Sequence, residues 1–594
     1  MVDLLMTIDI EHLFALAERT FAAGRLDETR LTLRNLDRLT DHPSVHHLTA
    51  LVEKRLGNLS EAETSFRSAL RLTPDDPQIN SNYANLLDTL GRHGEALSHY
   101  DRAISVAPDF MDAQFNRALM MQRLGELTKA LSAVEALLAG GPVTTRLHLA
   151  RASLLRDLDK LGPAAEAFDA ALALDPSHRV ALHGRARIAL ERGEADAVSR
   201  YQRALAMNTD DPDVNLGYAH ALEYEGLAQQ GIAHLARFNA AHPEASALHS
   251  ALAEMRWEAG AGVTFTQDLN AAIAVRPADP ALRQSLVGVL AGAGLFAPAA
   301  DAALVARSVI GDDPVMTLLE ATYASEAGEV ERADRLFAAL PVAMEERLLP
   351  AALHLLRTGE IERAAKLVDA ARAARPDSIF AWALTSLVWR MTDHSRAAWL
   401  SEQPGLIARL SLDFDPVNLG GIASLLRSLH RTRAYPIGQS LRGGTQTRGR
   451  LFERLEPEIR LLFAAIQRAV GRYWSALPAA DPDHPLLRHR ATGPRIEGSW
   501  SVRLINGGFH VAHFHPRGIV SSACYLTVPE AQAPMEGWLE IGGAPASLSL
   551  PLEPLTRVRP EPGTLALFPS YLYHGTRPFT AGERLTSAFD VVPG

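Results

Sequence analysis

The chain has 594 residues, and at about 100–200 residues per domain this length is too great for one compact core. Hydrophobic residues make up 47% and charged residues 22%, which excludes a disordered or collagen-like chain. The formal net charge of -10 gives no general attraction to phosphate backbones, so we expect no nucleic-acid partner.

The N-terminal residues and the apolar runs bear on location. The first eleven residues carry acids and lack the basic flank of a secretory signal. No apolar run reaches the roughly 18 residues that indicate a membrane span. The single cysteine, Cys524, excludes an internal disulfide and a cysteine-based zinc site. We therefore expect a cytoplasmic protein with no membrane partner.

A repeat of about 34 residues fills the first two thirds of the chain. Asp159 takes the one slot that lacks a glycine, 34 residues after Gly125 and 34 before Gly193. Prolines mark a second phase at the same spacing, at positions 74, 108, 142 and 176. The glycine series itself comprises Gly24, Gly57, Gly91, Gly125, Gly193, Gly226, Gly260, Gly294, Gly328 and Gly359.

Each unit has the pattern of two helices joined by a tight turn. In residues 86–97 a helical pattern stops at Gly91, which supplies the left-handed turn, and a second amphipathic helix follows. Tyr100 and Ala103 lie on the apolar face of that helix, and Pro108 ends it. By residue and period the units resemble tetratricopeptide repeats. The resemblance implies an α-solenoid over residues 11–390 whose concave surface binds an extended ligand.

The last third of the sequence changes character, because the period disappears past Trp399. Short apolar runs separated by glycine and proline predict an antiparallel barrel or jelly roll. A helix over residues 455–474 is expected to pack outside it. The predicted fold class is therefore multidomain, an α-solenoid followed by a β domain at 395–594. The predicted strands cover residues 499–504, 522–528, 538–541, 564–568 and 585–591.

Histidines in the β domain form the most informative cluster. Residues two apart on a strand face the same side, so His513 and His515 can point into one barrel mouth while Phe514 packs outward. His574 follows 59 residues after His515. Imidazole suits iron, zinc, copper and nickel, and three protein ligands with open positions are typical of a catalytic site.

A basic residue and a hydroxyl residue that could bind a carboxylate follow the histidines in the sequence. Arg584 lies ten residues after His574, and Thr586 falls on the same strand face. A guanidinium and a hydroxyl placed in this way could grip a carboxylate.

This region resembles the iron(II) and 2-oxoglutarate dependent oxygenases, whose fold is a double-stranded β-helix. The family pattern is His-x-Asp/Glu, a distal histidine and a basic residue about ten positions later. His513, His574 and Arg584 with Thr586 match it, and the resemblance implies iron(II), 2-oxoglutarate and O2 as cofactors and cosubstrate. Residues 439–447 and 498–504 further resemble a bacterial group of tetratricopeptide-linked oxygenases of this kind.

His515 departs from the family pattern because it stands where the carboxylate normally does. Three interpretations are open. The ligands are His513, His515 and His574; or His510 or an acid elsewhere ligates; or the site has lost iron and only binds. Tyr525 could donate its hydroxyl to 2-oxoglutarate or simply pack in the barrel.

Two further arginines have competing interpretations. Arg503 and Arg442 could each hold the substrate or 2-oxoglutarate, or each could form an ordinary structural ion pair.

The resulting hypothesis is an oxygenase that hydroxylates a peptide or protein side chain presented by the repeats. The first alternative is a three-histidine dioxygenase of cupin type that does not use 2-oxoglutarate. The second is a repeat scaffold that binds a protein partner and whose β domain is catalytically silent.

Overall fold

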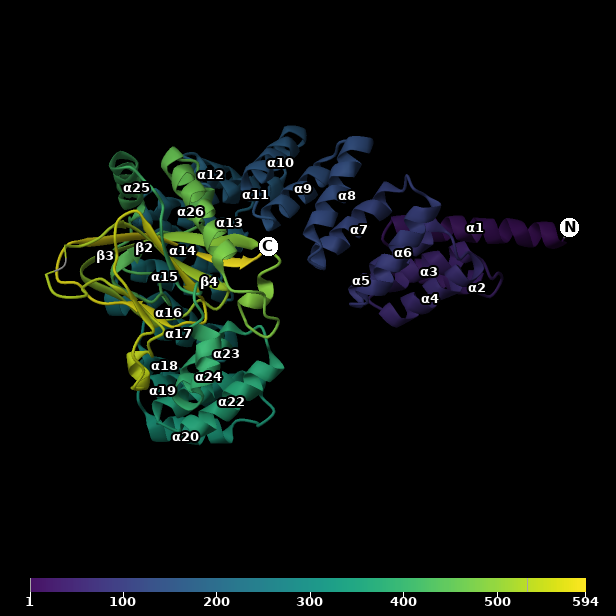
Figure 1. The fold of residues 1–594 in the computed structure, drawn as a ribbon. Coiled ribbons are helices and arrows are strands. Elements are labelled where there is room, and N and C mark those ends of the chain that lie inside the picture. Colours follow the sequence, from purple (N-terminus) through teal and green to yellow (C-terminus); the bar gives the residue numbers. More distant parts are fainter. Residues whose placement is uncertain (1, 531) are drawn as a thin grey trace. The chain divides into compact units, whose positions relative to one another are not determined.

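The computed structural model describes residues 2–530 and 532–594. It divides into two compact units, Met1–Ile188 and Ala189–Gly594, which we describe separately (Figure 1). The limits predicted for the solenoid and the β domain, 11–390 and 395–594, remain a proposal.

The first unit is built from antiparallel helix pairs. Small and aromatic residues alternate in its core, where Phe66, Ala69 and Tyr100 are buried, as expected for closely packed repeats. The helices are α1 (Val2–Ala22), α2 (Leu26–Asp37), α3 (Pro43–Arg55), α4 (Leu59–Leu72), α5 (Pro77–Thr89), α6 (His93–Val106), α7 (Met111–Arg123), α8 (Leu127–Gly140), α9 (Thr145–Asp157) and α10 (Leu161–Leu174); α11 (Arg179–Glu191) contains the division.

The repeat glycines sit where the sequence predicts turns. All ten have positive φ, for example +79° at Gly125, and each follows the first helix of a pair. Asp159, in the slot without a glycine, also adopts a left-handed conformation, with φ +58°. The turn geometry is therefore common to the repeats, and one aspartate adopts it without the freedom that glycine has.

The second unit continues the helix pairs and ends in a sheet. The pairs run from α12 (Ala197–Met207) and α13 (Pro212–Tyr224) through α14 (Ala228–Ala241), α15 (Ser246–Glu258), α16 (Gln267–Val275), α17 (Pro280–Gly292), α18 (Phe296–Ile310), α19 (Pro314–Glu326), α20 (Val330–Ala339), α21 (Leu348–Arg357) and α22 (Ile361–Ala374) to α23 (Ile379–Thr392) and α24 (His394–Ser401).

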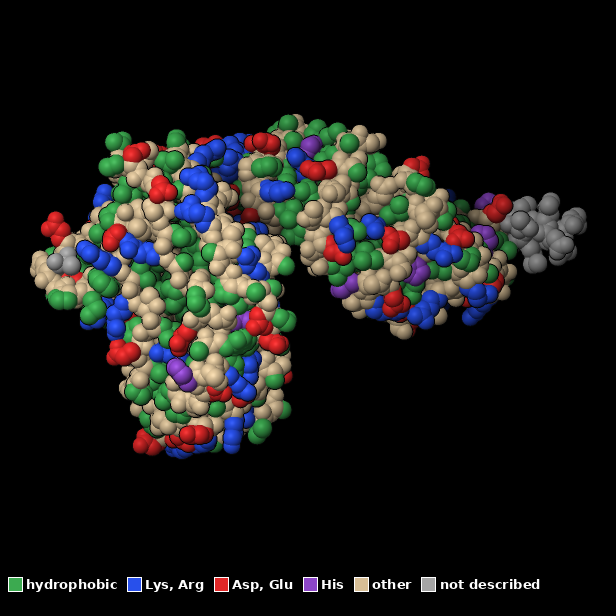
Figure 2. Space-filling view, in the orientation of Figure 1, with side chains coloured by type: hydrophobic (Ala, Val, Ile, Leu, Met, Phe, Trp, Pro, Cys, Tyr) green, Lys and Arg blue, Asp and Glu red, His purple; other side chains and the backbone are tan. Residues whose placement is uncertain are grey.

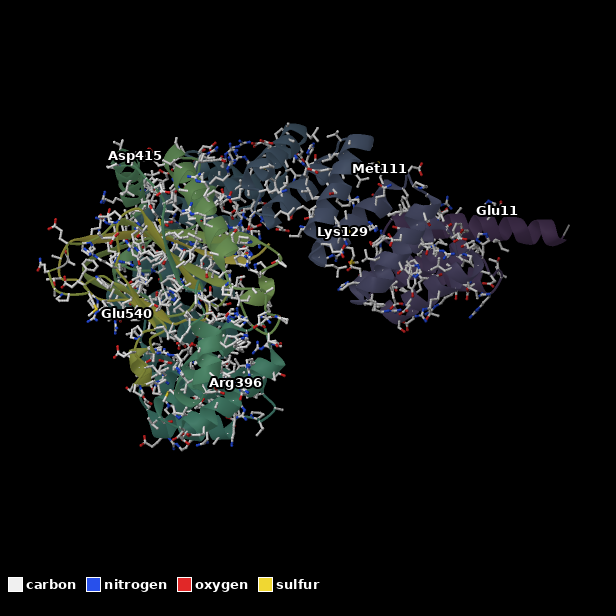
Figure 3. All side chains as sticks on the ribbon, viewed as in Figure 1. Glu11, Met111, Lys129, Arg396, Asp415 and Glu540 are labelled. Carbon is white, nitrogen blue, oxygen red and sulfur yellow. The ribbon has the colours of Figure 1, made fainter. Side chains whose placement is uncertain are left out.

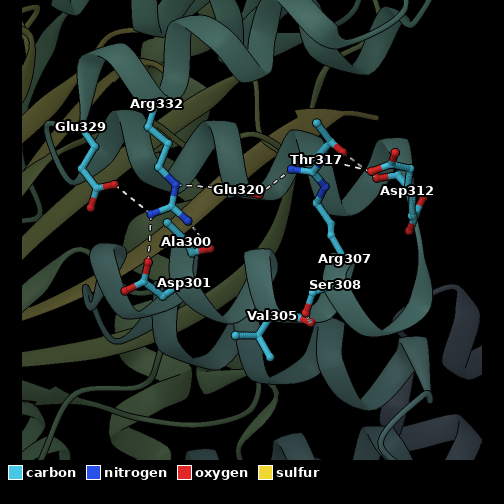
Figure 4. Close-up of polar contacts among 11 residues, drawn as sticks. Ala300, Asp301, Val305, Arg307, Ser308, Asp312, Thr317, Glu320, Glu329 and Arg332 are labelled. Carbon is cyan, nitrogen blue, oxygen red and sulfur yellow. Dashed lines mark hydrogen bonds and ion pairs between the residues drawn. The ribbon is translucent and has the colours of Figure 1, made fainter.

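An ion-pair network joins three of these helices (Figure 4). The carboxylate of Glu320 on α19 is 3% exposed. It forms ion pairs with Arg307 of α18, through Nη1 at 2.7 Å, and with Arg332 of α20, through Nε at 2.9 Å. Arg332 also contacts Asp301 and Glu329, each at 2.9 Å. Each buried charge in this network is therefore compensated.

Nine strands of the described chain form one antiparallel sheet of jelly-roll type, in the order β1-β7-β4-β9-β3-β8-β5-β6, with β2 on β3. The predicted strands and the helix outside them are confirmed. The elements are β1 (Ala408–Ser411), α25 (Pro416–Leu429), β2 (Leu441–Gln446), α26 (Pro457–Ala476), β3 (Pro494–His513), β4 (Val520–Thr527), β5 (Leu539–Ile541), β6 (Thr556–Val558), β7 (Thr564–Pro569), β8 (His574–Thr576) and β9 (Glu583–Pro593).

The last helix pairs and the sheet share one hydrophobic core, in which Trp389, Leu400, Tyr473 and Phe568 are all buried. Tyr571 donates its hydroxyl proton to the carbonyl of Leu400 at 2.6 Å. Glu540 on β5, labelled in Figure 3, forms an ion pair with Arg557 on β6 at 3.1 Å, and both side chains are partly exposed. The repeats of this unit therefore support the β domain directly.

Residues 431–438, which we name the strap, cross the ends of three helices of the repeat array. Arg431 donates to the carbonyl of Tyr224 at 2.5 Å, the Arg433 amide to Glu258 O at 2.8 Å, and the Gly438 amide to Gly292 O at 2.9 Å. These acceptors end α13, α15 and α17. The strap thus fastens the segment before β2 to three successive repeats.

The visible surface mixes positive, negative and hydrophobic side chains (Figure 2). Within residues 2–530 and 532–594, no helix combines the length and the apolar character that crossing a membrane requires.

Candidate metal centre

Three histidines predicted as ligands come together at one end of the sheet. Ring nitrogens of His513, His515 and His574 all lie within 4.8 Å of one another. His513 on β3 stands opposite His574 on β8 in the strand register. His515 lies past the end of β3, so strand alternation alone does not place it. Its Nε2 is nevertheless 3.3 Å from Nε2 of His513.

The far nitrogen of two of these rings is fixed by the backbone. His513 Nδ1 lies 2.9 Å from the carbonyl oxygen of Val511, and His574 Nδ1 lies 3.0 Å from that of Leu572. A carbonyl oxygen can only accept, so each Nδ1 carries the proton and each Nε2 presents a lone pair. This is the orientation in which proteins prepare histidine as a metal ligand.

Asp590 holds the third ring in the same way. Its Oδ1 lies 2.5 Å from Nδ1 of His515 and accepts that proton. In the family pattern a carboxylate stands at the position of His515. Here a carboxylate, that of Asp590, instead contacts the Nδ1 side of the His515 ring. The sequence analysis missed Asp590, although its signal was present. Alternate residues on β9 share one face, and Arg584, Thr586, Ala588 and Asp590 all line the same cavity.

Burial keeps His513 and His574 neutral. It lowers the pKa of His513 to about 3, and the neighbouring His515 lowers it further. Burial also lowers the pKa of His574 well below its ordinary value, with His513 adding to the effect. A metal ion requires the neutral imidazole, so these two rings need not lose a proton at pH 7.

His510 lies beside the three histidines rather than among them. Its Nδ1 is 2.9 Å from Ser440 Oγ, which is 3.1 Å from Nε2 of His513. Because His513 Nε2 must accept, the Ser440 hydroxyl donates to it and accepts from His510. A metal ion on His513 would therefore have to turn this hydroxyl away.

Arg584 is a buried cation without a counter-ion. Its side chain is 2% exposed, and within the described residues it makes no ion pair and its Nε has no hydrogen-bond partner. Its Cζ lies 5.1 Å from the centroid of the Tyr525 ring, whose hydroxyl also lacks a partner. Burial lowers the pKa of Arg584. A guanidinium left in this way is suited to a ligand carboxylate.

The histidines and Arg584 line one cavity of about 610 Å³. Thr586 lines it next to Arg584, and its hydroxyl is 3.5 Å from the carbonyl of Val502. Gly292 and Phe296, at the junction of α17 and α18, form part of the wall. A repeat pair therefore helps to close the cavity.

The two other arginines behave differently. Arg503 points away from the cavity, because Val502 and Leu504 on either side of it face inward, and its Nε pairs with Glu583 at 2.6 Å. The structure thus does not bring Arg503 to the site. Arg442 does line the cavity. Its guanidinium donates to the carbonyls of Gln439 and Leu441, each at 2.8 Å.

Comparisons with known proteins agree with this architecture. Residues 498–590 match the family model described as "Putative 2OG-Fe(II) oxygenase". Residues 47–109 and 84–144 match the model described as "Tetratricopeptide repeat". Among curated proteins none matches the chain.

Two of the solved structures that are similar to the chain match it over a large part of their own length. One is a tetratricopeptide repeat protein from Parabacteroides merdae, with 18% identity over 41% of this chain and 97% of the other and a TM-score of 0.34. Another is yeast Tom70, with 15% identity over 66% and 97% and a TM-score of 0.32. By the two family models alone, the chain carries tetratricopeptide repeats within residues 47–144 and a domain at residues 498–590 that matches the "Putative 2OG-Fe(II) oxygenase" family.

Proposed function

We propose that the protein is an iron(II)- and 2-oxoglutarate-dependent oxygenase that hydroxylates a peptide or protein side chain. The observation that carries the proposal is one cavity that holds both halves of the required site. Three imidazoles present unprotonated Nε2 atoms to one point, and Arg584 supplies an uncompensated buried cation. The family match over residues 498–590 supports it.

The residues fit the cofactors as follows. His513, His515 and His574 would hold iron(II), and Arg584 with Thr586 would bind the far carboxylate of 2-oxoglutarate. Tyr525 would steady Arg584 through its ring face. When bound, the metal and 2-oxoglutarate supply the oxidising chemistry with O2, yielding succinate and carbon dioxide.

The chain itself contributes position, charge and exclusion of water. Asp590 keeps the His515 proton on Nδ1 and makes Nε2 a more basic ligand. Its negative charge stands near the metal without occupying a coordination position, which compensates for the absent carboxylate ligand. Phe514 packs on Phe380 of α23, with ring centroids 5.1 Å apart, and shields the ligands from that side.

The direct test is succinate formation from 2-oxoglutarate by the full chain, followed by NMR, with and without added iron(II). We expect succinate to depend on both iron and protein, and to increase when peptides are supplied. Failure of the purified protein to bind 2-oxoglutarate in calorimetry, with a metal ion present, would contradict the proposal.

A second candidate is a three-histidine dioxygenase that does not use 2-oxoglutarate. The observation that favours it is the third ligand, which is His515 rather than a carboxylate. The two functions differ in their need for Arg584. Arg584→Met abolishes turnover in the leading proposal and leaves it largely intact in the alternative.

The repeats are proposed to bind the peptide or protein partner. The strap already occupies the ends of α13, α15 and α17. A partner that uses the repeats therefore cannot hydrogen-bond to the terminal backbone carbonyls of these three helices.

A further inference from the structure

A second cavity lies directly beside the candidate metal centre. It has a volume of about 500 Å³ and lies between the repeat helices α13 and α15 and the β domain. Gln439, Gln446 and Trp500 line both cavities. The Trp500 ring lies 5.6 Å from the His515 ring, centroid to centroid. The two cavities therefore share a wall that touches a metal ligand.

The repeat side of this second cavity is acidic. Glu223 from α13 and Glu254 and Glu258 from α15 all line it. Glu223 is 5% exposed and Glu258 is 2% exposed. Arg448 approaches two of them, with Nη2 at 2.5 Å from Glu258 and Nε at 3.0 Å from Glu223. Among the described residues, Glu254 has no ion-pair partner.

Several polar atoms of the cavity lack partners. Glu223 Oε1, Glu258 Oε2 and the Tyr224 hydroxyl are buried, and within the described chain they make no hydrogen bond. Burial raises the pKa of Glu258 to about 7, Arg448 lowers it, and Glu223 and Glu254 raise it again. Three carboxyl groups thus share one close cation, and a further cation would lower the free energy of this arrangement.

Two other arginines and one histidine of the cavity wall do not reach these carboxyl oxygens. Arg454 pairs with Glu456, and Arg431 donates to the Tyr224 carbonyl at 2.5 Å. His220 adds no positive charge, because burial lowers its pKa to about 3. The unpartnered carboxyl oxygens of Glu223 and Glu258 therefore receive no hydrogen bond from these residues.

The lining also offers two aromatic faces. Tyr224 and Trp500 both border the cavity, and aromatic faces attract cations through their ring electrons. The guanidinium of Arg454 already lies over one face of Tyr224, with Cζ 5.2 Å from the ring centroid. Carboxylates beside aromatic rings favour a guanidinium or an ammonium group over a neutral or anionic one.

We propose that this cavity binds the guanidinium or ammonium end of an arginine or lysine side chain of the polypeptide substrate. That the cavity binds a cationic side chain is independent of the proposed function. That this side chain belongs to the substrate rests on the proposed function. The shared wall at Trp500 would then hold the substrate segment next to the cavity of His513, His515 and His574.

Peptide binding without turnover tests this. Two fluorescent peptide libraries, identical except for a central arginine or its neutral isostere citrulline, are titrated onto the metal-free full chain and followed by polarisation. We expect the arginine library to bind at least about tenfold more tightly. Glu254→Gln should remove most of that difference. Glu225→Gln is the matched control, since Glu225 is an exposed neighbour at the end of α13 outside the cavity.

Equal affinity for the two libraries would overturn the inference, as would equal effects of Glu254→Gln and Glu225→Gln. If Glu254→Gln lowers the thermal stability, Tyr224→Phe replaces it, because it removes only an unpartnered hydroxyl. Free L-arginine binding as tightly as the library would overturn the polypeptide source. His574→Ala should retain the arginine preference, so failure of this inference and failure of the oxygenase proposal give different results.

Discussion

The repeats and the candidate metal centre of this chain obtain their geometry in opposite ways. A repeat turn at Gly125 depends on residues within a few positions, and the same solution recurs about every 34 residues. The centre draws on Ser440, His513, His574 and Asp590, which the sheet brings together over 150 positions of sequence. Local periodicity therefore reveals the scaffold, whereas the chemistry depends on strand pairing.

The largest contrast is expected between histidines of the two regions. His574→Ala removes one of the three proposed ligands, so affinity for cobalt(II) should fall more than about 100-fold. His234→Ala in the repeats removes a ring that contacts Asn215 at 2.9 Å and Tyr218 edge-on, and should leave metal affinity unchanged. Calorimetry with cobalt(II) measures both. Similar metal binding by His574→Ala and the unaltered chain would rule out the assigned ligand set.

Substitution of Arg584 in the β domain and of Arg332 in the repeats should have different effects on the free energy of unfolding. Arg584→Met should lower 2-oxoglutarate affinity about 100-fold, while the free energy of unfolding without ligand stays equal or rises, since an uncompensated buried charge is removed. Arg332→Met breaks the pairs with Glu320, Asp301 and Glu329, and should cost about 2 kcal/mol of stability. Urea unfolding and calorimetry separate the two. A clear loss of stability in Arg584→Met would mean that Arg584 is structural.

Two histidine–aspartate contacts, one in the candidate metal centre and one in the repeats, should differ in their effect on metal affinity. Asp590→Asn keeps a partner for His515 but removes the charge, so metal affinity should fall about tenfold. Asp334→Asn acts on the His354 contact of the repeats, at 3.0 Å, and should not alter metal binding. If the two variants bind cobalt(II) equally, Asp590 does not tune the centre.

The free energy of unfolding should depend on pH through His484, a buried histidine of the β domain. His484 donates from Nε2 to the Leu400 carbonyl, and its Nδ1 accepts from the amides of Leu486 and Leu487. Burial lowers its pKa to about 4. The unfolded chain takes up this proton first, so the stability due to neutral His484 is complete above pH 6.5 and is lost as the pH falls through 4. Urea unfolding at pH 7 and pH 5 should show a smaller decrease for His484→Gln than for the unaltered chain.

The smallest effect separates two glycines of neighbouring repeats. Gly125→Ala places a side chain at φ +79° and should cost about 1 kcal/mol. Gly94→Ala lies in helix α6 with open space around it and should gain up to about 1 kcal/mol. Thermal unfolding should therefore shift in opposite directions, and a shift in the same direction would contradict the assigned role of the turn.

These contrasts explain what the sequence could predict. The 34-residue period was enough to place the helix pairs, and the Asp159 slot was correctly predicted as a turn. The strands also followed from alternation and spacing, whereas His515 lies past the end of β3 and its place beside His513 and His574 does not follow from alternation. For Arg503 the sequence left two interpretations open, and the ion pair with Glu583 on β9 agrees with the structural one. Asp590 was overlooked because its partner, His515, lies 75 positions away.

The strap has a consequence for how such a chain can change over evolution. Its anchors, Tyr224, Glu258 and Gly292, are spaced one repeat apart. An inserted or deleted repeat between them would leave residues 431–438 too short or too long, and would move Gly292 and Phe296 out of the cavity wall. Repeat number should therefore be fixed in this stretch and free to vary between homologues before residue 189.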